Sequence, residues 1–169
     1  MSNDNKTIFS DEIFERGCAF LDCGFMCHKM QENTNPLYFR DPMVVNYSFA
    51  CEVFLKAMLY NNEIKVKKKH GLKDLFEQLP SDLQELIQER TVDWCGQWND
   101  AFGLPLLREI SDAFVIWRYS FENDFSRSAS KSIRIGFLTG FSNALRETCC
   151  ECLFKMTWEQ YMDQRRGVR

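Results

Sequence analysis

Two groups of residues have the types and spacing that acid–base or phosphate chemistry requires. The first centres on His70, which follows Lys67, Lys68 and Lys69 and precedes a short apolar segment. Nearby positive charge and a helix N-terminus both favour a neutral imidazole, which acts as a base or a hydrogen-bond partner near pH 7. The alternative is that His70 only caps the short helix and packs against its neighbours.

The second group places charged residues beside apolar helix faces. Arg118 and Glu122 are four residues apart in one segment, and Glu52 and Lys56 are four apart in another. Residues at this spacing are neighbours on a helix surface. If the two segments face each other, the four side chains form a charge network. Either Arg118 then holds a phosphate with two parallel hydrogen bonds, or the network only fixes the register of the helices.

Other catalytic and metal-binding patterns are missing from the sequence. It contains no Gly-rich phosphate loop, no HExxH and no nucleophile elbow. Cys23, Cys27 and His28 offer an alternative zinc site, but the eight cysteines form no pair of CxxC motifs. We therefore expect small buried cysteines in a reduced protein, a core role for His28, no metal and no cofactor.

Composition and length indicate one packed domain. The 169 residues are 45% hydrophobic and carry a formal net charge of −3, which argues against general nucleic-acid binding but allows a local basic patch. We expect a single domain over residues 1–169, with a core at about 9–157 and a frayed basic tail at 163–169. The polar start and the lack of a long apolar run predict a cytoplasmic protein without a membrane span.

Hydrophobic periodicity predicts helices along nearly the whole chain. We expect an all-α bundle of four long helices, with one or two short helices between the second and third long ones. Gly17 and Gly24, one heptad apart, would allow a close helix approach, and Ser81 with Gln84 predicts a capping box. The long helices are predicted at about 10–30, 42–60, 105–125 and 131–156, the short ones at 72–79 and from 81, and a loop at 91–105.

Three segments resemble HEPN domains, the higher-eukaryote and prokaryote nucleotide-binding superfamily. The similar elements are E-x-x-L-K-A-x-L from Glu52 to Leu59 and H-x-L-x-x-L-F-x-x-L from His70 to Leu79. A third element, F-x-x-W-R-Y-x-F-E, starts at Phe114. Together they cover roughly residues 40–125.

The resemblance implies a helical bundle that is often dimeric, so we expect a homodimer. Many HEPN proteins are metal-independent ribonucleases in toxin–antitoxin, phage-defence or RNA-processing systems. Their active site is an arginine followed four to six residues later by a histidine. Arg118 lies on the corresponding segment, but no histidine follows it at that spacing.

We therefore expect a divergent, non-catalytic HEPN-like domain that binds nucleic acid, a nucleotide or a protein partner such as a cognate antitoxin. The expected ligand or phosphate contacts are Lys56, Lys67, Lys68, Lys69, Glu52 and Glu122. One alternative is a metal-independent endoribonuclease, in which His70 approaches Arg118 in space and the two act as base and cation. Another alternative is a structural or regulatory interaction protein.

Overall fold

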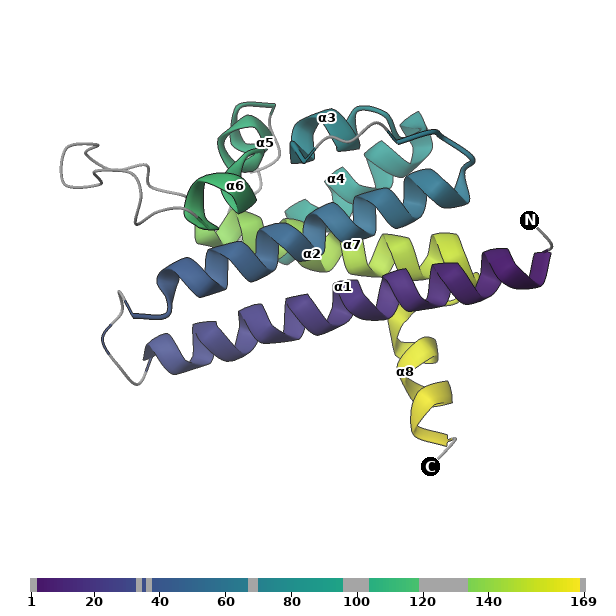
Figure 1. Cartoon of the computed structure of the whole chain (residues 1–169), viewed down its shortest axis with the longest axis horizontal. Coiled ribbons are helices and arrows are strands. Elements are labelled where there is room, and N and C mark those ends of the chain that lie inside the picture. Colours follow the sequence, from purple (N-terminus) through teal and green to yellow (C-terminus); the bar gives the residue numbers. More distant parts are fainter. Residues whose placement is uncertain are drawn as a thin grey trace.

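The computed structural model describes residues 3–32, 35, 38–66, 70–95, 104–118 and 134–167, with the side chains of residues 3–10, Glu32 and Leu104 left out. Every regular element in these ranges is an α-helix (Figure 1). The predicted all-α bundle is therefore confirmed. The helices are α1 (Asn3–Glu32), α2 (Arg40–Asn61), α3 (Leu72–Phe76), α4 (Ser81–Cys95), α5 (Leu104–Ile110), α6 (Ala113–Arg118), α7 (Ile135–Phe154) and α8 (Trp158–Gly167).

Helix α2 is the centre of the bundle. It packs against α1, α3, α6 and α7, which lie on different sides of it. The hydrophobic periodicity that predicts this helix corresponds to a stripe of seven apolar residues, all of which are buried. They are Val44, Tyr47, Cys51, Phe54, Leu55, Met58 and Leu59.

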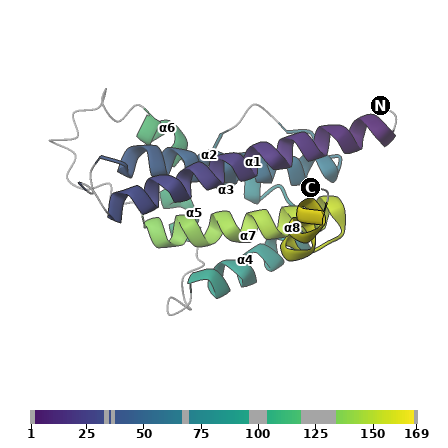
Figure 2. The same ribbon diagram turned by 90° about the horizontal axis from the view of Figure 1, so that it is seen from below.

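Helices α1 and α2 form an antiparallel pair, and both views show them side by side (Figures 1 and 2). Aromatic rings of α2 pack directly against two glycines of α1. A Cβ atom on Gly17 would lie 2.5 Å from Phe54 Cε1, and one on Gly24 would lie 2.6 Å from Tyr47 Cδ1. The predicted close approach at these two glycines is thus confirmed.

Helix α8 leaves the bundle after Lys155, which adopts a left-handed conformation with φ 57°. Its first turns pack against the bundle through Trp158 and Tyr161, which surround the ring of Phe14. The rest of α8 projects away from the other helices (Figure 1). The prediction of a frayed tail from residue 163 is wrong as far as Gly167, the last residue of this helix.

The helix predicted over 105–125 is interrupted. Helix α5 ends at Ile110 and α6 begins at Ala113. The backbone N–H of Leu72 donates to the Ser111 carbonyl at 3.0 Å, and the backbone N–H of Lys73 donates to Ser111 Oγ at 3.1 Å. Ser111 therefore accepts hydrogen bonds from the first turn of α3, and the helix predicted over 105–125 is broken at this position. Residues 119–125 lie outside the described ranges.

Three smaller predictions about helix ends are also wrong. The first helix begins at Asn3, well before Ser10. Helix α4 continues into the predicted loop as far as Cys95, and Trp94 in its last turn is 48% exposed. The capping box is replaced, because the backbone N–H of Gln84 donates to the carbonyl of Pro80.

All eight cysteines are free. Burial raises the pKa of the Cys18 thiol to about 12, which keeps it protonated and unreactive near neutral pH. The expectation of buried thiols fails for Cys23, which is exposed. His28 is partly buried, with Nδ1 3.4 Å from the Tyr47 hydroxyl. Within the described ranges, no helix combines the length and the apolar character that a membrane span requires.

We predict that Gly17→Ala and Gly24→Ala destabilise the fold. Overpacking a core costs roughly 1–3 kcal/mol, which exceeds the gain of about 1 kcal/mol from replacing a helical glycine by alanine. Gly136 of α7 is the matched control, because a Cβ atom there meets nothing within 4 Å. Urea unfolding should show a lower free energy of unfolding for the two α1 variants and an equal or higher one for Gly136→Ala. Equal stability of all three variants would contradict the prediction.

Candidate functional site

Helix α2 holds a buried carboxylate together with a lysine one turn further on. Glu52 is 2% exposed, and its Oε1 accepts a hydrogen bond from Lys56 Nζ at 2.6 Å. Burying a charge is costly unless it is paired, so Lys56 offsets the cost of keeping Glu52 inside the bundle. This pair is one half of the network that the sequence predicts.

His70, in the loop just before α3, reaches the same carboxylate. Its Nδ1 lies 2.9 Å from Glu52 Oε1. Since an ionised carboxylate only accepts hydrogen bonds, Nδ1 carries the proton that is donated, and Nε2 remains for contact with a ligand. The His70 side chain is 57% exposed. The capping alternative is wrong, because the N-cap of α3 is Gly71 and not His70.

The second oxygen of the Glu52 carboxylate is buried without a partner. Among the described residues, Oε2 has no hydrogen-bond donor. A buried polar atom without a hydrogen bond costs about 1–3 kcal/mol, more for a charged group. Glu52 therefore keeps a buried acceptor without a donor on the same carboxylate that binds His70.

A surface cleft of about 360 Å³ lies beside His70. It forms where the loop before α3 meets the turn between α5 and α6, through the hydrogen bonds to Ser111. The approach is close, because a Cβ atom on Gly71 would lie 3.2 Å from Ser111 Oγ. The lining residues are His70, Gly71, Lys73, Asp74, Arg108, Ser111 and Asp112.

The cleft carries both signs of charge. Lys73 and Arg108 are its cations, and Asp74 and Asp112 are its carboxylates. Lys73 is also paired with Glu77 at 2.6 Å, whereas Arg108 is exposed. A ligand that combines an anion with hydroxyl or amine donors matches this arrangement better than a simple anion does.

Arg118 is not among the residues that line the cleft. It is exposed at the end of α6, with its guanidinium carbon 5.3 Å from the centre of the Phe114 ring. Phe114 in turn stacks on Phe49 of α2. Arg118 thus lies over α6 and α2, while His70 bonds to Glu52 and faces the cleft.

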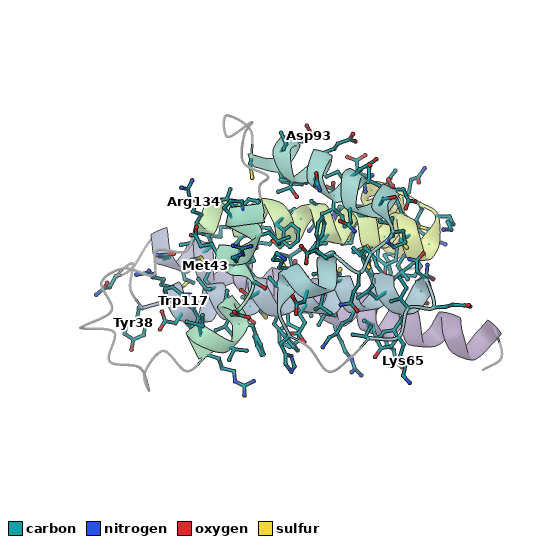
Figure 3. All side chains as sticks on the ribbon, turned by 90° about the horizontal axis from the view of Figure 1, so that it is seen from above. Tyr38, Met43, Lys65, Asp93, Trp117 and Arg134 are labelled. Carbon is teal, nitrogen blue, oxygen red and sulfur yellow. The ribbon has the colours of Figure 1, made fainter. Side chains whose placement is uncertain are left out.

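The predicted site residues are therefore gathered only in part. The structure brings Glu52, Lys56 and His70 together. Figure 3 shows this side of the molecule, with Lys65 of the loop after α2 and Trp117 of α6 toward opposite ends. The remaining predicted contacts, Lys67, Lys68, Lys69 and Glu122, lie outside the described residues.

Sequence reasoning missed six residues of the cleft. They are Gly71, Lys73, Asp74, Arg108, Ser111 and Asp112. A signal existed, because Ser and Asp are favoured at helix N-caps, and Ser111–Asp112 directly precede the apolar start of α6. The apolar periodicity of residues 107–121 is continuous, so it predicts one helix and gives no sign of the break between α5 and α6.

The family model for the HEPN domain matches residues 39–136. This match covers more than half of the chain and includes Glu52, His70 and Arg108. The chain belongs to the HEPN domain family. Neither the curated proteins nor the solved structures give a match to it.

We predict that breaking the Glu52–Lys56 pair on one side costs more than removing both charges. Lys56→Met leaves a buried carboxylate with one partner fewer and should lower the free energy of unfolding by about 2 kcal/mol. The double variant Glu52→Met, Lys56→Met removes the buried charge as well and should recover at least half of that loss. Urea unfolding of both variants measures the difference. A double variant less stable than Lys56→Met would show that the pair itself stabilises the fold.

Proposed function

We propose that this HEPN domain is a divergent, non-catalytic member that binds a phosphate-bearing ligand, RNA or a nucleotide, in the cleft beside His70. The observation that carries the proposal is the convergence of His70, Lys73 and Arg108 on one cleft. These are the side chains that proteins use for phosphate, with Arg108 able to offer two parallel N–H groups. The serine hydroxyl of Ser111 adds a neutral donor.

The two carboxylates support a ribonucleotide over inorganic phosphate. Asp74 and Asp112 repel a bare anion but accept hydrogen bonds from sugar hydroxyls or base amines. The ligand would place its phosphate toward the cations and its donors toward these acids. The Lys67–Lys69 run precedes His70 in the chain and would add phosphate contacts of low sequence specificity.

We predict that Arg108→Ala weakens binding of ATP and of a short single-stranded RNA by at least tenfold, because it removes a charged hydrogen-bond donor to phosphate. Fluorescence anisotropy across a salt series should show a smaller dependence of RNA affinity on salt, by about one unit of slope for each lost phosphate contact. The control is Arg166→Ala, an exposed arginine of the projecting α8. Equal weakening by both substitutions would mean that the cleft is not the binding site.

A second candidate function is metal-independent RNA cleavage, favoured by the hydrogen bond between His70 and Glu52. A buried carboxylate that orients an imidazole is the arrangement a general base needs. In such a reaction His70 Nε2 would take the proton of the 2′-hydroxyl. The 2′-oxygen would attack the adjacent phosphorus to form a 2′,3′-cyclic phosphate, and the bond from phosphorus to the 5′-oxygen would break, with a proton from water completing the leaving 5′-hydroxyl. A nearby cation would stabilise the phosphorane.

We predict no cleavage of structured or single-stranded RNA by the wild-type protein in excess EDTA, since the chain lacks the arginine–histidine spacing of HEPN ribonucleases. Gel analysis of end-labelled RNA tests this. Cleavage that disappears in folded His70→Ala would establish the second candidate function instead. Comparison of Arg108→Ala with Arg118→Ala would then identify the cation, with circular dichroism to check the fold of each variant.

A further inference from the structure

Arg146 of α7 is a buried arginine without a counter-ion. The residue is only 9% exposed, and its Nε is enclosed without a hydrogen-bond partner. Among the described residues, no carboxylate forms an ion pair with it. Arginine is almost never buried to this degree unless it is paired, because removing a charge from water is costly.

A second arginine shows how the same helix treats a guanidinium that it does satisfy. Arg90 of α4 donates to Glu151 Oε1 at 2.7 Å and to Thr148 Oγ1 at 3.1 Å. Both acceptors lie on α7, the helix that carries Arg146. Arg90 has these partners although its side chain is 19% exposed. The more deeply buried arginine is therefore the one that lacks a partner.

The groups around Arg146 do not neutralise its charge. Burial raises the pKa of the Cys18 thiol to about 12 and that of the Cys150 thiol to about 11, so both are uncharged near neutral pH. Asp22 is exposed, and Glu147 accepts a hydrogen bond from an indole of α4. Both acids raise the pKa of Arg146 from a distance, while burial lowers it. The guanidinium stays protonated at neutral pH in any case.

Helix α8 covers Arg146 from one side. The guanidinium carbon lies 4.3 Å from the centre of the Trp158 ring. This cation–π contact offsets part of the cost of burial, but a ring over the face of the guanidinium accepts no hydrogen bond from Nε in its plane. Helix α8 contains no buried residue, so it is held less firmly than α7, whose core residues are enclosed.

We propose that Arg146 anchors a second ligand site, which binds a carboxylate at the junction of α1, α7 and α8. The two oxygens of a carboxylate match Nε and one terminal nitrogen of a guanidinium, so the ligand supplies the acceptor that Nε lacks. A tilt of α8 would admit it. The inference does not depend on the proposed function, because α8 lies on the opposite side of the α1–α2 pair from α3 and α5 (Figure 1).

The charges nearby favour a carboxylate over a phosphate. Asp22 and Glu147 act on Arg146 electrostatically, so they also repel an anion bound to it. The repulsion is proportional to the charge of the ligand, and a phosphate dianion feels it twice as strongly as a carboxylate does. The rings of Trp158 and Tyr161 are partly exposed beside the site, and they suit an apolar body on the ligand.

Thermal unfolding with sodium benzoate tests the site, with benzamide as the uncharged control compound and sodium chloride to match the ionic strength. At about ten times its dissociation constant, benzoate should raise the Tm of the wild type by roughly 3–6 °C. Benzamide should not, and sodium phosphate should have a smaller effect. Arg146→Met keeps an unbranched apolar chain without the charge, so its Tm should not respond to benzoate. An equal rise in wild type and Arg146→Met would overturn the proposal.

The stability of the variants without ligand tests whether Arg146 is satisfied within the chain. Arg146→Met should unfold at the same or a higher temperature than the wild type, because it removes an unpaired buried charge. Arg90→Met is the matched control. It should unfold at a lower temperature, since it leaves Glu151 without its partner, and should keep the response to benzoate. A loss of stability in Arg146→Met as large as that in Arg90→Met would overturn the proposal.

Two compounds distinguish the source of the carboxylate. Benzoate represents a free small acid, and N-acetylglutamate α-amide represents the acidic side chain of a protein partner, with N-acetylglutamine α-amide as its control. A saturable rise in Tm identifies the source by the compound that causes it, and no rise with either compound would overturn the proposal. The affinity for ATP should be unchanged in Arg146→Met. Its loss would overturn the claim that this site is separate from the cleft.

Discussion

Helix α2 is enclosed on several sides, and this enclosure forces one of its own carboxylates into the interior. Glu52 is buried within the bundle, so its charge must be offset by groups that the fold brings to it. Lys56 lies on the same helix, whereas His70 reaches Glu52 only because the loop between α2 and α3 turns back toward α2. The position of the loop before α3 is therefore tied to the burial of one side chain.

The same constraint shapes the cleft. Once His70 bonds to Glu52, α3 begins immediately beside α2, and its first N–H groups need acceptors. Ser111 supplies them with its carbonyl and its hydroxyl. A straight helix from 105 onward would use the Ser111 carbonyl within itself, so the break between α5 and α6 and the start of α3 stabilise each other. The cleft, which is lined in part by Arg108, lies where these hydrogen bonds join the start of α3 to the turn between α5 and α6.

The sequence was sufficient to predict what depends on local periodicity. The apolar stripe of α2 and the glycines of α1 were recognisable, because burial in a helical bundle repeats every three to four residues. The pairing of Glu52 with Lys56 followed from spacing alone. The contact between His70 and Glu52 did not, since it joins residues eighteen positions apart through the path of a loop. The interruption at Ser111 was equally hidden, because tertiary hydrogen bonds overrode a continuous helical pattern.

The departure from the arginine–histidine spacing of HEPN ribonucleases has a physical consequence for any chemistry at this site. When both groups lie on one helix, the helix itself fixes the distance between them. Here the imidazole is held by a carboxylate of α2, and the arginine of the cleft, Arg108, belongs to α5. Their separation therefore depends on how α3 and α5 pack against each other. This dependence supports our proposal that the site holds a phosphate, because aligning a proton transfer requires the base and the cation to be fixed to within a fraction of an ångström.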